Sequence, residues 1–183
     1  MLTVKRIKII LLLLPVVGCL LVPALAQQQV GEYQIKAAFL YNFAKFVDWP
    51  ACNACNDSDF FIIGILGDDP FREEIEAIAG KSVKEKRLAI ERSATLEGLK
   101  NCQVIFISAS AKTDLPRILK KLKDQPVLTV GDTPGFAEAG VMINLYTADN
   151  KIRFEINPAA ADQAGLKISS QLLKLARIVE SKE

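Results

Sequence analysis

Residues Glu32 to Pro50 read EYQIKAAFLYNFAKFVDWP, and their spacing predicts a helix that is apolar on nearly all sides. Its polar side chains fall on one narrow stripe, formed by Gln34, Tyr41, Lys45 and Asp48. Such a helix must be buried on more than one side, either within the core of its own domain or partly against a second chain. The Trp49-Pro50 pair is predicted to end it, because proline disfavours helical geometry in the residue before it.

The N-terminal segment has the pattern of an export signal. Basic residues at positions 5, 6 and 8 precede an apolar run, and Ala-Leu-Ala at residues 24–26 supplies small residues for a cleavage site. Proline and glycine interrupt the apolar run, which is too short for a stable membrane span. The sequence Val-Val-Gly before Cys19 resembles a lipobox, which would make Cys19 a lipidated N-terminus. Cleavage after Ala26 is favoured, because the two leucines after Cys19 are unusual at the start of a lipoprotein.

Cleavage after Ala26 leaves residues 27–183, a length that suits one domain with a real core. Three of the 23 basic residues lie in the signal, so 20 basic residues remain against 21 acidic ones. This balance offers no basic surface for phosphate backbones, and nucleic acid is therefore not an expected partner. We expect membrane contact only through a partner protein, unless Cys19 is lipidated.

Three cysteines remain in the exported chain, and export places them where thiols tend to pair. They are Cys52, Cys55 and Cys102. A structural disulfide is expected, either from the loop to Cys102 or between Cys52 and Cys55. The Cys52-Asn-Ala-Cys55 spacing is that of a redox pair, but its place in a polar loop disfavours that role. The chain has no histidine, which removes histidine-based catalysis and metal sites, and no metal or cofactor is expected.

Apolar runs alternate with helix signals through the middle of the chain. The expected strands are Phe60 to Leu66, Arg87 to Arg92, Gln103 to Ser108 and Val127 to Val130. The expected helices between them are Pro70 to Ala79, Thr95 to Lys100 and Ala111 to Lys123. This order predicts an α/β fold with a mainly parallel sheet and helices on both faces.

The end of the chain has a different pattern. The strands Val141 to Tyr146 and Lys151 to Ile156 are separated by a short polar connection, which predicts an antiparallel hairpin. Two closing helices follow, Ala159 to Ala164 and Ile168 to Val179. Polar residues before proline mark helix starts, at Asp69, Thr133 and Asn157.

Three predicted strands end in small or polar residues. Ligands of open parallel sheets bind beyond the carboxyl ends of the strands, so these residues would share one sheet edge. The candidate lining of a small-molecule crevice is Gly67, Asp68, Ser108, Ser110, Asp132 and Thr133. The hypothesis rests on fold analogy, and the alternative is that these are ordinary strand-to-helix turns.

Five blocks of the sequence resemble the YfiR family of exported bacterial proteins: YQIKAAFLYNFAKFVDWP, IGILGDDPF, CQVIFIS, PVLTVGDTPGFAEAGVMINL and KIRFEINPAAADQAGLKISSQLLKLARIV. The resemblance covers essentially the whole mature chain. It implies a periplasmic α/β protein of a Gram-negative bacterium, without catalysis, that tends to dimerise. It also implies repression of an inner-membrane diguanylate cyclase through its periplasmic portion, which lowers cyclic-di-GMP signalling and biofilm formation. The family has disulfides, and Cys102 matches a cysteine often present at that place.

The sequence therefore supports two functions. The first is a periplasmic regulator that binds a membrane signalling protein through the first and closing helices, with Tyr41, Lys45 and Trp49 as candidate partner-surface residues. The second is a periplasmic small-molecule-binding protein that uses the crevice at the strand ends. An enzyme is not expected, because no nucleophile, base and orienting group come together in the sequence. Raised cyclic-di-GMP in a deletion strain would favour the regulator, and a defect limited to one nutrient or stimulus would favour the binding protein.

Overall fold

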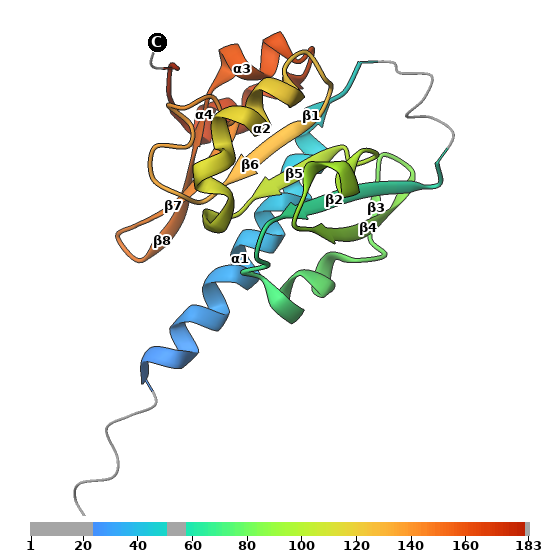
Figure 1. The fold of residues 1–183 in the computed structure, drawn as a ribbon. Coiled ribbons are helices and arrows are strands. Elements are labelled where there is room, and N and C mark those ends of the chain that lie inside the picture. Colours follow the sequence, from blue (N-terminus) through green and yellow to red (C-terminus); the bar gives the residue numbers. More distant parts are fainter. Residues whose placement is uncertain (1–23, 51–57, 182–183) are drawn as a thin grey trace, which may run out of the picture.

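The computed structural model describes residues 24–50 and 58–181. An eight-stranded, mostly parallel sheet runs through the middle in the order β10-β8-β7-β6-β5-β2-β4-β3, and helices lie on both of its faces (Figure 1). The α/β architecture expected from the sequence is confirmed. Within the described residues, no helix combines the length and the apolar character needed to cross a bilayer.

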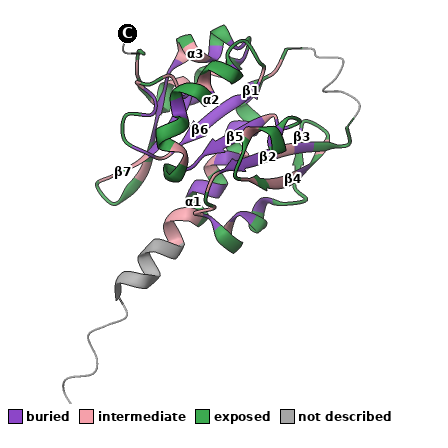
Figure 2. Cartoon of the chain, in the orientation of Figure 1, coloured by how far each residue is buried: buried purple, intermediate pink, exposed green. Residues whose placement is uncertain are grey.

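Four parallel strands form the centre of the sheet. They are β2 (Phe60–Leu66), β4 (Lys86–Ser93), β5 (Val104–Ile107) and β6 (Leu128–Gly131). Every residue of β5 and β6 is buried, because elements cover both faces of the sheet at this point (Figure 2). The strand expected at Arg87 to Arg92 is longer than predicted, since β4 pairs in parallel along the whole of β2. The short β3 (Ser82–Val83) adds an antiparallel edge to β4.

Helix α1 (Ala24–Phe46) packs its buried residues Leu40, Phe43 and Ala44 against one face of the sheet. The helix ends at Phe46, so the expected end at Trp49-Pro50 is wrong. The chain instead forms β1 (Val47–Asp48), which pairs antiparallel with β9 (Lys167–Ile168). Pairing with this later segment ends the helix earlier than proline would.

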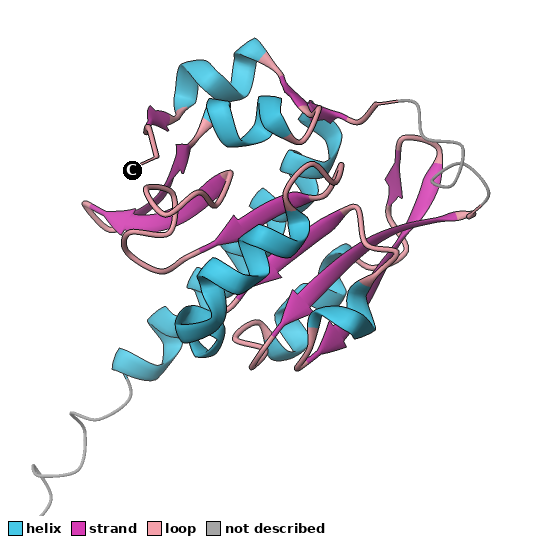
Figure 3. Cartoon of the chain, turned by 45° about the horizontal axis from the view of Figure 1, so that its top comes forward, coloured by secondary structure: helices cyan, strands magenta, loops and turns pink. Residues whose placement is uncertain are grey.

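The opposite face of the sheet is covered by shorter elements, as Figure 3 shows by secondary structure. The 3-10 helices η4 (Leu96–Leu99) and η5 (Ala109–Asp114) precede helix α2 (Leu115–Leu122). The helix expected at Ala111 to Lys123 is therefore divided into η5 and α2. On the α1 face, the segment expected as the helix Pro70 to Ala79 is the 3-10 helix η3 (Arg72–Ile78). The Asp69 carboxylate accepts hydrogen bonds from the backbone N–H groups of Phe71 and Arg72 just before it.

The antiparallel hairpin near the C-terminus is confirmed as β7 (Ile143–Ala148) and β8 (Lys151–Ile156). Asn157 caps α3 (Pro158–Gln163) by accepting a hydrogen bond from the N–H of Ala160 at 3.1 Å, as its position before proline predicts. Residues 133–140 form turns, so the helix start expected at Thr133 is wrong.

The last closing helix is shorter than predicted. Helix α4 (Ser170–Leu175) is flanked by β9 and by β10 (Arg177–Ile178), which pairs in parallel with β8. The expected apolar stripe on one long helix does not form: Leu172 is buried, whereas Leu175 is 76% exposed. Backbone pairing to β1 and to β8 takes both ends of the segment out of helical geometry.

Several sequence predictions lie outside the described residues. They are the basic and apolar parts of the export signal, the Cys19 processing site, and the loop that carries Cys52 and Cys55. Helix α1 begins at Ala24, so the expected cleavage after Ala26 falls within its first turn.

Candidate functional site

The candidate crevice residues lie at one edge of the sheet. Gly67 and Asp68 follow β2, Ser108 to Ser110 follow β5, and Asp132 with Thr133 follows β6. Because β2, β5 and β6 are parallel neighbours, their carboxyl ends meet at the same edge. The edge nevertheless divides into two halves with different surroundings.

The half of the edge formed by β2, β4 and β5 is hollow. A cavity of about 330 Å³ lies there, between the strand ends and α2. Gly67, Asp68 and Ser110 line it, together with Thr95 and Glu97 from the segment after β4. We call this cavity, with those five residues, the open half of the edge.

Hydrogen bonds hold the rim of the open half together. The N–H of Gly67 donates to the Ser93 carbonyl at 3.0 Å, and the N–H of Asp68 donates to Ser110 Oγ at 2.8 Å. The hydroxyls of Ser108 and Ser110 are 2.8 Å apart. Gly67 has a φ of +92°, and a Cβ at this position would lie 2.4 Å from Ser108 Oγ and 2.5 Å from Ser110 Oγ. Only glycine fits here without displacement of the serine hydroxyls.

The half of the edge at β6 is closed by α1. Lys36 Nζ donates a hydrogen bond to Asp132 Oδ2 at 2.8 Å and pairs with Glu32 at 2.6 Å. The side chains of Lys36 and Asp132 are only 5% and 8% exposed. The hydroxyl of Tyr33 also donates to Asp132, at 3.2 Å, and the Lys36 ammonium lies 4.4 Å from the centre of the Tyr33 ring. We call Glu32, Tyr33, Lys36 and Asp132 the closed half.

Electrostatics in the closed half favour the charged lysine. Burial lowers the pKa of Lys36, but its hydrogen bonds to Asp132 and Glu32 outweigh this effect, and the pKa is raised. Burial raises the pKa of Tyr33, and the negative charge of Asp132 raises it further. The cluster is therefore a buried ion pair that fastens α1 to the end of β6.

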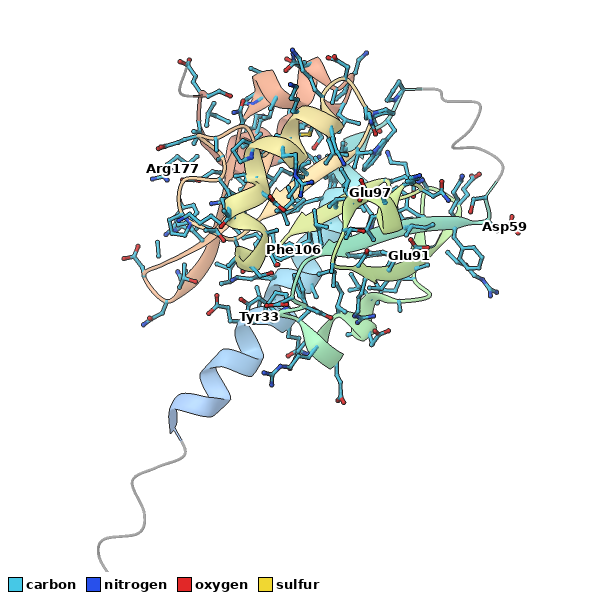
Figure 4. The ribbon with its side chains drawn as sticks, viewed as in Figure 1. Tyr33, Asp59, Glu91, Glu97, Phe106 and Arg177 are labelled. Atoms are coloured by element: carbon cyan, nitrogen blue, oxygen red, sulfur yellow. The ribbon has the colours of Figure 1, made fainter. Side chains whose placement is uncertain are left out.

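Aromatic contacts continue from the closed half into the sheet. The Tyr33 and Phe71 rings meet edge to face at 5.3 Å, and Phe71 meets Phe106 of β5 at 4.7 Å. Figure 4 labels Tyr33 on α1 and Phe106 in the sheet. Lys36 and Glu32 were not singled out from the sequence, although their spacing of four residues is that of a helical ion pair.

The candidate partner-surface residues do not all lie on an open surface. The Tyr41 hydroxyl donates to the Ser82 carbonyl at 3.1 Å, and the ammonium groups of Lys45 and Lys81 each lie 5.3 Å from its ring. Lys45 is exposed. Trp49 packs edge to face on Phe61 at 5.2 Å, and its indole nitrogen is buried. Trp49 therefore supports the end of α1 against the core.

Large apolar side chains are exposed on α1 and near the C-terminus. Ile35 and Phe46 are 49% and 38% exposed, although the sequence predicted an apolar, covered surface there. They are eleven positions apart, which is close to three helical turns, so they lie on one side of α1. Leu175 and Ile178 are 76% and 52% exposed. We call these four residues the apolar face.

The C-terminal part of the apolar face lies beside the end of α1. Helix α4 packs against α1, and the N–H of Ser169 donates to the Phe46 carbonyl at 3.0 Å. Ile178 is in register with Ile156, whose side chain belongs to the same core cluster as α1. Exposed apolar side chains that gather in one region mark interaction surfaces, so these four residues are candidates for one.

Cys102 is buried against Leu99 and Gly64, with its sulfur 3.8 Å from the Glu91 carboxylate. Burial, with the nearby Glu91 charge, raises its pKa to about 12. The thiol is therefore protonated at neutral pH when it is unpaired. A disulfide between Cys102 and Cys52 or Cys55 stays a prediction, because the other two cysteines lie outside the described residues.

These features define an open, mainly parallel α/β domain with an exposed apolar face on its long N-terminal helix and on the segment after α3. The chain belongs to the YfiR/HmsC-like family, whose sequence profile matches residues 33–177. The family resemblance expected from the sequence is thereby confirmed. It is a regulatory, non-catalytic family of periplasmic proteins linked to diguanylate cyclase signalling.

Other comparisons add little. A comparison with curated proteins found no match. One similar solved structure is the ABC domain in complex with L-Trp from Streptococcus pneumonia, at 10% sequence identity and a TM-score of 0.48. That similarity covers 65% of this chain and 55% of the other.

Proposed function

We propose that this protein is exported to the periplasm, where it binds the periplasmic portion of an inner-membrane diguanylate cyclase and represses it. Family membership over residues 33–177 is the observation that carries the proposal. Repression by binding needs a recognition surface and no reacting groups. The apolar face supplies such a surface.

The apolar face is suited to a protein partner. Ile35, Phe46, Leu175 and Ile178 are branched or aromatic side chains with between a third and four fifths of their surface in water. Covering such side chains with a partner removes apolar surface from water, which is the main favourable contribution to association. The face also combines two segments that lie far apart in the sequence, so it exists only when the domain is folded.

A deletion strain complemented with variants tests the proposal. We expect Phe46→Asp and Leu175→Asp to lose repression, so that cyclic-di-GMP rises to the level of the deletion strain and biofilm increases. Loss of an interface anchor costs about 2 kcal/mol or more, roughly a thirtyfold loss of affinity. Capture of the cyclase from solubilised membranes by the tagged protein measures binding directly.

Phe60→Asp is the matched control. Phe60 is 47% exposed, similar to the residues of the apolar face. It alternates with Phe61 and Ile63, which face α1, so its side chain is directed to the other face of the sheet. We expect this variant to repress the cyclase normally. Failure to capture a cyclase with the wild-type protein, or full repression by the apolar-face variants, would contradict the proposal.

Self-association through the same face is the competing outcome. Light scattering on the purified variants distinguishes the two uses. Loss of a dimer in Phe46→Asp with unchanged repression would show that the face joins two copies of this chain instead of binding the cyclase.

A further inference from the structure

The connections that leave β2 and β5 run to opposite faces of the sheet. After β2, the chain passes to the α1 face, where Phe71 and Ile75 are buried in the same cluster as α1. After β5, it passes to the other face, where Leu115 and Ile118 of α2 are buried. Strands β2 and β5 are adjacent and parallel. The strand order therefore reverses between them, which is the place where open α/β sheets leave a crevice for ligands.

The open half of the edge lies at this reversal. Its cavity of about 330 Å³ is bounded by the ends of β2 and β5, by the segment after β4 and by α2. That volume falls at the lower end of the range for small-molecule pockets. The hydrogen bonds around Gly67 and Ser110 hold the rim in place without a ligand, which lowers the ordering cost of binding.

The cavity combines an apolar wall with paired charges. Leu66, Leu96 and Ile118 supply the apolar wall. Lys121 pairs with Glu97 at 2.6 Å, and Arg117 pairs with Asp114 at 2.6 Å. Within the described residues, the Asp68 carboxylate has no hydrogen-bond or ion-pair partner, since only its backbone N–H is engaged.

This lining determines which ligand charge is acceptable. Three acidic and two basic residues line the cavity, so an anion such as phosphate meets a net negative lining. A hydroxyl both donates and accepts hydrogen bonds, so it binds a carboxylate or a paired cation without leaving a charge uncompensated. A ligand with several hydroxyls on a ring of carbon atoms therefore matches this lining. Its hydroxyls bind the carboxylates, and its ring packs on the apolar wall.

We infer that the open half is a binding site for a neutral, hydroxyl-rich small molecule of monosaccharide size. Asp68, Thr95 and Ser110 contact its hydroxyls, and Leu66 with Leu96 contacts its carbon skeleton. The inference does not depend on the proposed repression of a cyclase, because it concerns binding by this domain alone.

Saturation-transfer NMR and isothermal titration with the purified mature protein test the inference. The probes are D-glucose, D-galactose and N-acetyl-D-glucosamine at concentrations up to 10 mM, with inorganic phosphate and L-leucine as the competing chemistries. We expect at least one sugar to bind, with the affinity reduced tenfold or more by Asp68→Ala and abolished by Thr95→Trp, which fills the cavity.

Two controls keep the result interpretable. Asp162→Ala removes an exposed carboxylate on α3, outside the cavity, and should leave sugar binding unchanged. Asp68→Asn keeps the shape of the side chain, and its thermal unfolding should match that of the wild type. Absence of sugar binding, binding of phosphate or leucine alone, or sugar binding that Asp68→Ala and Thr95→Trp leave intact would overturn the inference.

Discussion

The two halves of the carboxyl edge carry similar residues, but one half is buried and the other borders a cavity. Aspartate follows β6 in the closed half and follows the Gly67 turn in the open half. Asp132 is buried by α1 and paired with Lys36, whereas Asp68 is exposed at the rim of a cavity. In Figure 4, Tyr33 of the closed half and Glu97 of the open half lie well apart, on elements that cover opposite faces. The same strand-end chemistry serves structure where α1 packs directly on it, and it borders a cavity where η4 and α2 leave space.

The largest expected effect is loss of the buried ion pair in the closed half. Lys36→Met leaves the buried Asp132 carboxylate without its cation, and we expect the free energy of unfolding to fall by about 3–5 kcal/mol. Urea denaturation measures the change. Addition of Asp132→Asn should restore part of the loss, because it removes the unpaired charge.

Lys84→Met is the control for this prediction. Lys84 pairs with Asp48 at an exposed position, and loss of such a pair changes stability by no more than about 1 kcal/mol. If Lys36→Met destabilises the protein no more than Lys84→Met, the closed half is not the anchor of α1.

A second prediction concerns the rim of the open half. Gly67→Ala adds a Cβ that collides with Ser108 Oγ and Ser110 Oγ at a positive φ, and we expect a loss of about 1–3 kcal/mol in unfolding free energy. Gly135→Ala is matched in φ, at +87°, but nothing lies within 4 Å of its Cβ. Its loss should be smaller, and equal losses in the two variants would show that the serine contacts do not matter.

Alkaline pH should weaken the closed half selectively. The pKa of Lys36 is raised in the folded protein, so its stabilising contribution is complete below the lysine pKa of the unfolded chain, about 10.4, and is lost as the pH rises through the folded value. The raised pKa of Tyr33 acts in the same direction. Urea denaturation between pH 8 and pH 11 should show falling stability. If the free energy of unfolding falls as steeply with pH in Lys36→Met as in the wild type, Lys36 is not the cause of the pH dependence.

The smallest effect is expected for an ion pair beside the open half. Arg117 and Asp114 are 66% and 58% exposed, so Arg117→Ala should change the free energy of unfolding by less than about 0.5 kcal/mol. Chemical denaturation of this variant beside Lys36→Met compares the two halves directly. A loss of several kcal/mol in Arg117→Ala would show that the open half is also a structural anchor.

Local sequence patterns predicted the elements better than their ends. The strands Phe60 to Leu66 and Lys151 to Ile156 form as predicted, because an unbroken apolar run and an alternating run each match one kind of sheet environment. The predicted ends at Trp49-Pro50 and at Val179 are wrong, because strand pairing with distant segments replaced the helix there.

The candidate site was also predicted only in part, because local patterns indicate the strand order but not the contacts between distant segments. Parallel strand order was enough to predict that Gly67, Ser110 and Asp132 lie at one edge of the sheet. It was not enough to show that Lys36 reaches Asp132 across 96 residues of sequence. The sequence left open whether a second chain covers part of the helix, and it could not show that Ile35 and Phe46 are the side chains left exposed, since helical periodicity shows which side chains share a side but not which side is covered.

The sequence by itself determined the α/β alternation, the central apolar strands, the hairpin and the family, because these depend on local periodicity, turn chemistry and residue identity. Only the tertiary structure decided which half of the carboxyl edge is filled and which apolar side chains stay in water. Those outcomes depend on where α1 and the connections after β2 and β5 pack, and that packing is fixed by contacts between residues far apart in the chain.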